Sequence, residues 1–265
     1  MPTDTPLPLP LTANCSILFP DLPLAERPAA AAAAGFDAVE FWWPFDTSVP
    51  GDAEIDRFVT AVSDAGVVLS GLNFTAGDMT AGERGILSDP ARRGEFTDNV
   101  DVAVGIGARL GTRGFNALYG NRIDGLDPAA QDEVAAQNLA LAGRAAARIG
   151  AVALLEPVSG IDRYPLRTAA DAVAALDRTG SGEVRLLLDI YHLAVNGDDP
   201  AAAIDRYADR IGHVQIADAP GRGEPGTGKL PIAALIERVH AAGYRGRISL
   251  EYRPVTADPF GWLSA

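Results

Sequence analysis

The sequence predicts a single barrel in which eight parallel strands alternate with helices. Short apolar runs alternate with longer, alanine-rich amphipathic stretches, which gives eight candidate strands with seven helices between them. Glycines stand where five of these helices should end, as expected for a left-handed residue after the last turn. Parallel neighbours need a crossover helix, so this order fits a closed (β/α)8 barrel, and 265 residues is a usual length for one.

The expected elements follow one another without a linker. We expect strands over residues 13–19, 37–42, 67–74, 112–116, 151–156, 184–189, 211–216 and 247–252. We expect helices over residues 24–34, 53–65, 90–110, 128–149, 168–178, 200–208 and 231–242. Only 13 residues follow Tyr252, so an eighth helix should be short or absent. An open doubly wound sheet is the alternative, but no GxGxxG motif follows the first strand.

The first ten residues differ from the rest of the chain. Residues 1–10 contain four prolines, which predicts a flexible lead-in to one domain over residues 11–265. This start lacks the features of a signal peptide, and no run of 18 apolar residues predicts a membrane span. We therefore expect a cytoplasmic protein that does not bind membranes.

Composition and charge exclude further classes of function. The chain has 22 basic and 35 acidic residues, and its net charge of −13 disfavours binding to the phosphate backbone of nucleic acids. Its single cysteine, Cys15, excludes an internal disulfide framework and a zinc site built from cysteines. The sequence leaves the oligomeric state open, including a homo-oligomer.

Four consecutive strands close with a polar side chain. Their apolar runs end in Glu156, Asp189, Gln215 and Glu251. In a barrel, the carboxyl ends of the strands form one rim, and that rim holds the active site. Three carboxylates in one concave site repel each other and have raised pKa values, and a divalent cation removes this repulsion. Because all-oxygen ligands suit Mg²⁺ or Mn²⁺, we predict a site for one of these metals.

Other residues near these strand ends are further candidates for the rim. His192 follows the sixth strand, and His213 points the same way as Gln215 because the two residues are two apart in a strand. Glu40, near the end of the second strand, is a candidate for the site or for a supporting contact. The loop over residues 76–85 contains glycines together with acidic and basic side chains, which favours a lid over the substrate.

The segment GEPGTGK over residues 223–229 matches most of a phosphate-binding motif. It fits the first seven positions of GxxxxGK[ST], but the eighth is Leu230, so the hydroxyl that should hold magnesium is missing. We therefore expect a glycine-rich loop over the barrel mouth and no nucleotide site.

Several segments occur in an order that one known family shares. They are GFDAVEF (35–41), AGDMTAGERG (76–85), EP (156–157), DIYH (189–192), GHVQIAD (212–218), RGEPGTG (222–228) and EY (251–252). Together they resemble the hydroxypyruvate isomerase family, which belongs to the xylose isomerase-like TIM barrels. The resemblance extends from about Leu11 to Trp262, and residues 213–228 are its most specific part.

The resemblance implies roles for individual residues. It implies a metal held by the same four side chains that end the strands, with Glu156 and Glu251 as the acid/base pair. Gln215, where related ketose epimerases usually have histidine, favours the hydroxypyruvate isomerase branch. The implied substrate contacts are His192, Arg222, Asp162 and Glu83.

The chain departs from its relatives at two places. Leu72 stands where relatives have a histidine before the asparagine, and the loop after the fifth strand lacks an expected asparagine near Ser159. Both departures touch the expected substrate pocket, so they affect the choice of substrate more than the type of reaction.

The implied reaction converts hydroxypyruvate into tartronate semialdehyde (2-hydroxy-3-oxopropanoate) by proton transfer through an enediolate. One glutamate takes a proton from carbon and the other handles its return to the neighbouring carbon. Because the substrate is a small anion and the chain carries −13, positive charge must come from the metal and Arg222.

Three alternatives remain open. The first is an isomerase or epimerase of a larger oxo-acid or ketose sugar, such as 2-oxo-tetronate, on the same metal site. The second is a metal-dependent endonuclease of the same fold, which would need several zinc-binding histidines, whereas the chain has three in all. The third is a non-catalytic protein that binds sugar acids, which would tolerate loss of the second glutamate, whereas both glutamates are present.

Overall fold

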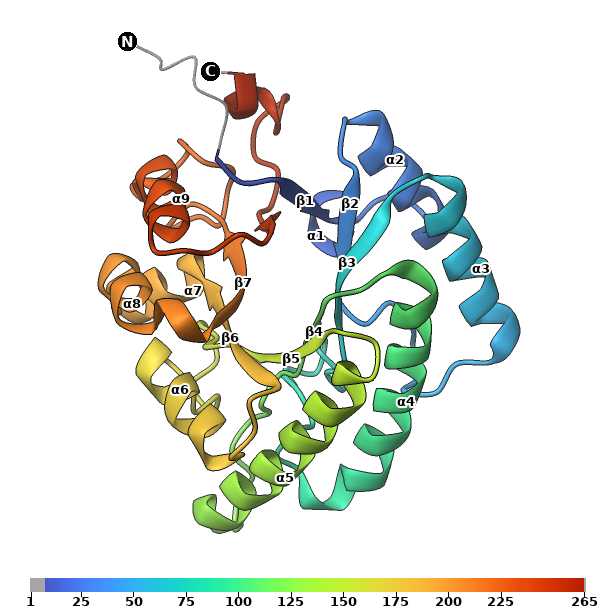
Figure 1. Cartoon of the computed structure of the whole chain (residues 1–265), viewed down its shortest axis with the longest axis vertical. Coiled ribbons are helices and arrows are strands. Elements are labelled where there is room, and N and C mark those ends of the chain that lie inside the picture. Colours follow the sequence, from blue (N-terminus) through green and yellow to red (C-terminus); the bar gives the residue numbers. More distant parts are fainter. Residues whose placement is uncertain (1–7, 265) are drawn as a thin grey trace.

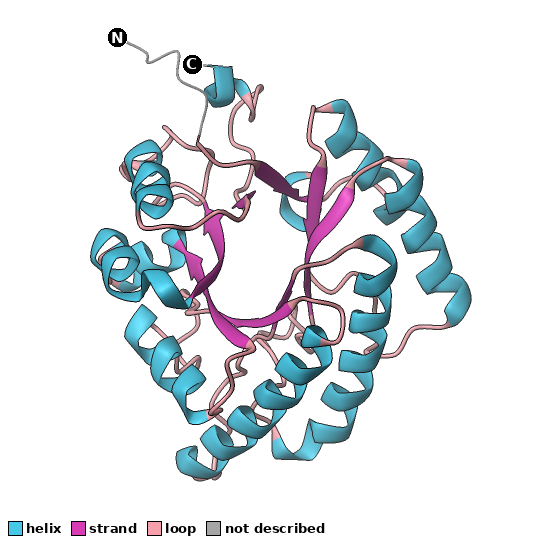
Figure 2. Ribbon diagram, in the orientation of Figure 1, coloured by secondary structure: helices cyan, strands magenta, loops and turns pink. Residues whose placement is uncertain are grey.

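Eight parallel strands form a closed barrel, and helices surround it (Figures 1 and 2). The computed structural model describes residues 8–264. The strands pair in sequence order and β8 pairs back with β1, so the barrel has no edge. They are β1 (Leu11–Asn14), β2 (Ala38–Phe41), β3 (Val68–Asn73), β4 (Gly114–Asn116), β5 (Val152–Leu155), β6 (Val184–Asp189), β7 (Ile211–Ile216) and β8 (Ile248–Leu250). This topology confirms the predicted fold class.

The helices form the outer ring in Figure 2. The α-helices are α1 (Cys15–Leu18), α2 (Arg27–Ala33), α3 (Asp52–Asp64), α4 (Arg93–Leu110), α5 (Pro128–Ala147), α6 (Ala169–Arg178), α7 (Ile190–Asn196), α8 (Pro200–Tyr207) and α9 (Ile232–Ala241). Short 3-10 turns are η1 (Leu24–Glu26), η2 (Pro90–Arg92), η3 (Ala208–Arg210) and η4 (Gly261–Ser264). Within residues 8–264, no helix is both long and apolar enough to cross a membrane.

Local sequence signals explain where the helices begin and end. Thr168 and Asp171 form a reciprocal capping box at the start of α6, in which each side chain accepts from the other's backbone N–H. Asp127 caps α5, whose first residue is a proline that needs no hydrogen-bond acceptor. Gly111 ends α4 in the left-handed region at φ 78°. These signals lie at the boundaries that the sequence predicts.

The first predicted strand is wrong in its extent. The apolar run over residues 13–19 was expected to be one strand, but β1 ends at Asn14 and α1 follows directly. The Asn14 side chain accepts from the backbone N–H of Ser16, which caps a helical turn. A short apolar run that is buried on all sides cannot be assigned to strand or helix by its periodicity.

Two further boundaries depart from the sequence prediction. The lead-in expected over residues 1–10 lies mostly outside the described residues, but Leu9 is buried and the carbonyl of Pro10 accepts from the N–H of Ile248. The sequence also does not predict α7, which begins directly after β6 with Asp189 as its N-cap. After β8, the described chain contains only η4, in agreement with the short or absent last helix.

Buried polar side chains lie inside the barrel, whereas aromatic side chains pack between the strands and the helices. In that outer layer Phe41 of β2 packs edge to face on Phe58 of α3, with the ring centroids 5.2 Å apart. Inside, Glu40 of β2 contacts His213 of β7. Because β2 and β7 are not neighbours in the sheet, this contact crosses the barrel. Polar side chains inside the barrel, such as Glu40, therefore contact residues of the rim such as Gln215.

Candidate active site

The four polar residues that end the last strands lie at one rim and are all buried. Glu156 follows β5, Asp189 ends β6, Gln215 lies near the end of β7 and Glu251 follows β8. Their exposed fractions are 7%, 2%, 1% and 5%. Glu156 and Glu251 line a cavity of about 450 Å³, which also contains the predicted residues His192 and Arg222. This volume is within the usual range for small-molecule sites.

The two glutamates of this cavity have raised pKa values. Burial raises the pKa of Glu156 well above its ordinary value, and the charges of Glu251 and Asp189 add to the effect. Burial also raises the pKa of Glu251 to about 8, although Arg222 opposes this shift. Glu251 can therefore hold a proton near neutral pH, and the pKa of Glu156 is shifted in the same direction, which suits both side chains to general acid/base catalysis.

Arg222 lies against Glu251 and is therefore not free in the cavity. Its Nη2 atom donates to Glu251 Oε1 at 2.7 Å, and Trp42 Nε1 donates to the same oxygen at 3.0 Å. The guanidinium also lies over the ring of Tyr191, 5.2 Å from its centroid. Arg222 has φ 57°, a left-handed conformation that is uncommon for residues other than glycine. The loop thus holds the arginine in one place between two glycines.

The structure adds Arg84, which the sequence analysis did not select. Arg84 lines the same cavity and comes from the loop between β3 and α4. Its Nη1 atom donates to the carbonyls of Met79 at 3.0 Å and Glu83 at 2.6 Å. Within residues 8–264 it forms no ion pair, and both burial and the charge of Arg222 lower its pKa. Arg84 therefore brings uncompensated positive charge to the cavity.

Two predicted substrate contacts are not brought to this cavity. Glu83 forms an ion pair with Arg92 at 3.0 Å and accepts from the backbone N–H of Asp78 at 2.6 Å. Its carboxylate thus holds the loop that presents Arg84. Asp162 is exposed in the loop after β5 and does not line the cavity. Substrate contacts by Glu83 and Asp162 stay predictions, and the observed geometry does not favour them.

His192 lies in the cavity with one ring nitrogen already engaged. The backbone N–H of Ser159 donates to His192 Nδ1 at 3.0 Å, so Nδ1 is an acceptor and Nε2 carries the hydrogen. Burial lowers the pKa of His192 to about 4, so the ring is neutral at physiological pH. Its backbone N–H donates to Asp189 Oδ1 at 3.0 Å. His192 can therefore offer an N–H group without adding a full charge.

A buried network below the rim contacts Gln215. Gln215 Nε2 donates to Glu40 Oε1 at 2.5 Å, and Asn14 Nδ2 donates to the same oxygen at 2.9 Å. His213 Nε2 lies 2.5 Å from Glu40 Oε2. Burial opposes ionisation of Glu40, but His213 and the two amides outweigh it and hold its pKa below the ordinary value. The carbonyl oxygen of Gln215 is buried and has no hydrogen-bond partner among residues 8–264.

The side chains at the rim are of the types that bind a hard divalent cation, but they are not arranged as a complete coordination site. Within residues 8–264, no group of three or more His, Cys, Asp and Glu side chains is arranged as a metal site. The predicted set instead combines three carboxylates with the amide of Gln215, whose buried Oε1 lacks a partner. Such an oxygen is costly unless something binds it, and oxygen ligands are those that Mg²⁺ and Mn²⁺ prefer. The orphaned oxygen is thus the observation that favours a cation.

The segment that resembles a phosphate-binding motif is a rim loop whose backbone is already bonded. The buried carboxylate of Asp218 accepts from the N–H groups of Gly226 at 2.9 Å, Gly228 at 2.8 Å and Leu230 at 2.9 Å. A phosphate would need these N–H groups. These backbone N–H groups already donate to the Asp218 carboxylate, so they are not free to bind a phosphate.

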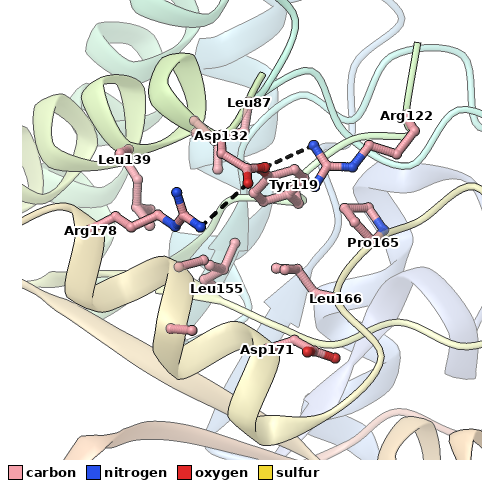
Figure 3. Close-up of a pocket in the computed structure, with 14 residues that line it drawn as sticks. Leu87, Tyr119, Arg122, Asp132, Leu139, Leu155, Pro165, Leu166, Asp171 and Arg178 are labelled. Carbon is pink, nitrogen blue, oxygen red and sulfur yellow. Dashed lines mark hydrogen bonds and ion pairs between the residues drawn. The ribbon is translucent and has the colours of Figure 1, made fainter. Parts of the chain in front are cut away.

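A second cavity of about 190 Å³ lies between α5 and α6 (Figure 3). Its charged groups pair with each other: Asp132 contacts Arg122 at 2.8 Å and Arg178 at 3.6 Å, and the hydroxyl of Tyr119 also donates to Asp132. None of the residues predicted for the site lines it. Its polar groups are satisfied, so the rim cavity remains the candidate active site.

Comparison with known proteins gives one consistent family. The family profile described as "Xylose isomerase-like TIM barrel" matches residues 28–264. A Streptomyces coelicolor protein named "Putative hydroxypyruvate isomerase" is 52% identical over 263 residues, which cover 95% of this chain and 94% of that protein. The "Hydroxypyruvate isomerase" of Escherichia coli is 33% identical over 256 residues, covering 95% and 97%.

Two further similar proteins have names other than hydroxypyruvate isomerase. The "2-oxo-tetronate isomerase" of Cupriavidus necator is 33% identical over 255 residues, which cover 95% of this chain and 96% of that protein. A crystal structure from Brucella melitensis described as "AP endonuclease, family 2" superposes with a TM-score of 0.87 and 32% identity, covering 97% and 98%. The fold is thus shared along nearly the full length of each chain.

Proposed function

The chain belongs to the hydroxypyruvate isomerase family of the xylose isomerase-like TIM barrels and is an isomerase, and we propose that it interconverts hydroxypyruvate and tartronate semialdehyde. The observation that carries this proposal is the pair of buried glutamates, Glu156 and Glu251, which line one cavity and have raised pKa values. Two proton carriers in one site can divide between them the removal and the return of the proton when a carbonyl shifts between adjacent carbons.

The two glutamates divide the proton transfers between them. In the forward direction one carboxylate removes a proton from the hydroxymethyl carbon, and the second carboxyl group delivers a proton to the former carbonyl carbon. The hydroxyl proton passes from one substrate oxygen to the other, so the product is an isomer and no proton is gained or lost. Arg222 and Trp42 both donate to Glu251 Oε1, which leaves Oε2 of that carboxylate for the proton.

We further propose that a divalent cation, Mg²⁺ or Mn²⁺, is held by the polar strand ends. The ligands would be Glu156, Asp189, Gln215 and Glu251. When bound, such a cation supplies positive charge that stabilises the two substrate oxygens as the carbon-bound proton leaves. It also relieves the repulsion among the carboxylates that raises the pKa of the two glutamates.

Positive and neutral donors at the cavity suit the rest of the substrate. Arg84 is unpaired within the described residues and is the better candidate for the substrate carboxylate, because Arg222 already contacts Glu251. Arg222 adds charge from the other side of the cavity. His192 offers its Nε2–H to a substrate oxygen. A small anion is thereby attracted to the rim of a protein whose net charge is −13.

A four-carbon oxo-acid is the second candidate substrate. The cavity of about 450 Å³ leaves room beyond a three-carbon acid, and a relative of 33% identity is named a 2-oxo-tetronate isomerase. An endonuclease activity is not favoured, because the three histidines of the chain lie apart. His192 lines the cavity, His213 contacts Glu40 and His240 belongs to α9.

A substrate panel in deuterated water tests the proposal. Hydroxypyruvate, 2-oxo-tetronate and a ketose are each incubated with the protein and added Mg²⁺ or Mn²⁺, and NMR follows the product and the exchange of the carbon-bound proton. We expect the highest kcat/KM with hydroxypyruvate. A preference for 2-oxo-tetronate would correct the substrate and keep the chemistry, whereas exchange with none of them would refute the isomerase assignment of this cavity.

A further inference from the structure

We propose that Glu40 is a positioning residue that fixes the side-chain amide of Gln215 so that its carbonyl oxygen is presented to the rim. The inference rests on the proposed metal site, because it explains how an amide at this position serves as an oxygen ligand. An amide has an oxygen at one end and an NH2 group at the other, and rotation by half a turn exchanges them. A metal ligand must have only one of these orientations.

The orientation follows from a chain of hydrogen bonds that starts at the backbone. The N–H of Ser16 can only donate, and it donates to the side chain of Asn14 at 3.1 Å, so that atom is Oδ1. The other end of the Asn14 amide is therefore NH2, and it donates to Glu40 Oε1 at 2.9 Å. Glu40 Oε1 must then be an acceptor.

The same oxygen of Glu40 decides the orientation of Gln215. Because Glu40 Oε1 already accepts from Asn14, the Gln215 atom that lies 2.5 Å from it must be the NH2 group. The carbonyl oxygen of Gln215 is consequently at the opposite end, where it is buried and no described residue hydrogen-bonds to it. This last link requires Glu40 to be a carboxylate, because a protonated carboxyl oxygen could accept from Asn14 and still donate to Gln215. The contact of His213 Nε2 with Glu40 Oε2 at 2.5 Å, beside the Asn14 amide on Oε1, favours the carboxylate.

The backbone around Glu40 is shaped to admit this side chain. Gly71 of β3 pairs with Glu40 across the sheet, and the register shifts between Val39 and Glu40. A Cβ atom added at Gly71 would lie 2.7 Å from Glu40 Oε2 and 3.0 Å from its Cγ. The strand therefore needs a glycine opposite Glu40, because a side chain there would displace the carboxylate.

The alternative is that Glu40 serves only as the buried partner of His213. In that case its contact with Gln215 would be incidental, and changing Glu40 would affect stability but not the orientation of the amide. The two readings differ in what happens when the acceptor oxygen is kept and only the charge is removed.

The test compares Glu40→Met with Glu40→Gln in the full-length protein. Methionine fills similar space but offers no strong acceptor, so the Gln215 amide should lose its fixed orientation. Glutamine keeps an oxygen that can accept from both amides. We expect Mn²⁺ affinity, measured by titration with detection of free Mn²⁺ by electron paramagnetic resonance, to fall about 10- to 100-fold in Glu40→Met. In Glu40→Gln the affinity should stay much closer to that of the wild type.

A second readout needs no metal. In the wild type the Gln215 NH2 group should give protected side-chain signals in ¹H–¹⁵N spectra of the metal-free protein, assigned by their loss in Gln215→Glu. The protection should persist in Glu40→Gln and disappear in Glu40→Met. If Glu40→Met does not fold, Gly71→Ala displaces Glu40 with its carboxylate intact, and Gly105→Ala, where an added Cβ meets nothing within 4 Å, is the control.

The outcomes separate the two proposals. Unchanged amide protection and Mn²⁺ affinity in Glu40→Met would overturn the positioning role. An equal loss in Glu40→Met and Glu40→Gln would also overturn it, because charge and not orientation would then be the cause. Protection that depends on Glu40 while the wild type binds no Mn²⁺ would uphold the orientation and refute the proposed metal site.

Discussion

Buried glutamates at the ends of the barrel strands fall into two groups that behave in opposite ways. Glu40 accepts hydrogen bonds from two amides and lies against His213, and these partners hold its pKa below the ordinary value in spite of burial. Glu156 and Glu251 are equally buried, but burial and neighbouring carboxylates raise their pKa values. The same side chain at a similar depth is thus held ionised in one place and keeps its proton to a higher pH in the other.

The difference shows that partners, and not burial alone, decide what a buried carboxylate does. Asp218 is a further buried carboxylate with a structural role, since three backbone N–H groups donate to it and hold the rim loop in shape. A carboxylate whose acceptors are all used supports structure or positions a neighbour. A carboxylate that faces other carboxylates in a cavity is stabilised when it binds a proton or a cation, because either relieves the repulsion. Such a carboxylate is therefore suited to proton transfer or metal binding.

The largest expected effect comes from the group with raised pKa values. Glu156→Gln and Glu251→Gln keep the shape of the side chain and an oxygen for the metal, but the amide cannot carry the proton. Each variant should lose about 10²–10⁴-fold in kcat at saturating metal while it stays folded. Removal of one carrier should still permit exchange of the substrate proton with solvent from one direction.

The two Glu→Gln variants also show which result would contradict a catalytic role for Glu156 and Glu251. Saturating metal is needed because each variant also loses a negative ligand. If either variant keeps more than about a tenth of wild-type turnover, that glutamate is only a ligand and the two-carboxylate mechanism is wrong. Circular dichroism and thermal unfolding serve as the control for folding.

Much of this site could be predicted from the sequence, because its polar residues interrupt apolar strands. Glu156, Asp189, Gln215 and Glu251 were recognisable since each closes a buried run, and strand order in a barrel brings consecutive strand ends together. Arg84 gave no such signal, because it lies in an irregular loop where neither periodicity nor strand position applies.

Other features escaped prediction because they depend on contacts between distant parts of the chain. Glu40 was a candidate from its position near a strand end, but its role depends on Asn14 and Gln215, which are 26 and 175 residues away. The resemblance placed Glu83 and Asp162 at substrate contacts. The structure instead places Glu83 against Arg92 and leaves Asp162 exposed. A motif locates a segment, but only the fold shows which of its side chains faces the cavity.

Binding of the substrate carboxylate should depend most on Arg84, which is half-buried in the cavity and forms no ion pair within residues 8–264. Arg84→Ala removes a charge-assisted contact worth about 1.5–3 kcal/mol, so KM should rise about tenfold to a hundredfold with a smaller change in kcat. Arg222→Ala should lower kcat as well, because it also frees Glu251 Oε1. Steady-state kinetics with hydroxypyruvate separates the two patterns.

The exposed Arg253 provides a matched control for Arg84. It lines the same cavity, but solvent screens its charge, so Arg253→Ala should raise KM less than Arg84→Ala does. If Arg253→Ala and Arg84→Ala have equal effects, the cavity attracts anions through its general potential, and Arg84 is not a specific anchor.

The metal-free protein should lose stability as the pH rises. The pKa of Glu251 is about 8 when folded, and that of Glu156 is raised as well, whereas an unfolded glutamate titrates near 4.3. Between these values the two glutamates bind more protons in the folded state than in the unfolded state. Below about pH 6.5 His192, whose folded pKa is about 4, acts with the opposite sign, but two glutamates outweigh one histidine, so the free energy of unfolding falls with rising pH. Tm, measured with a chelator present, should therefore decrease from about pH 4.5 to about pH 8.

Substitution of one glutamate shows whether the dependence of Tm on pH comes from the glutamates of the cavity. Glu251→Gln cannot titrate, so its Tm should depend less on pH over the same interval. Added Mn²⁺ should stabilise the wild type more at pH 8 than at pH 5, because metal and protons compete for the same carboxylates. A Tm that rises over this interval in the metal-free wild type would contradict the raised pKa values.

The smallest effect is expected at the loop whose sequence resembles a phosphate-binding motif. Lys229 is exposed, and the backbone N–H groups around it are bonded to Asp218, so Lys229→Ala should leave kcat/KM unchanged and shift the free energy of unfolding by no more than about 0.5 kcal/mol. Asp218→Asn is the contrasting variant. Its amide cannot accept from all three N–H groups, so it should destabilise the fold by about 1–3 kcal/mol. Isothermal titration with ATP should detect no binding to the wild type, and tight binding that disappears in Lys229→Ala would show that the loop does hold phosphate.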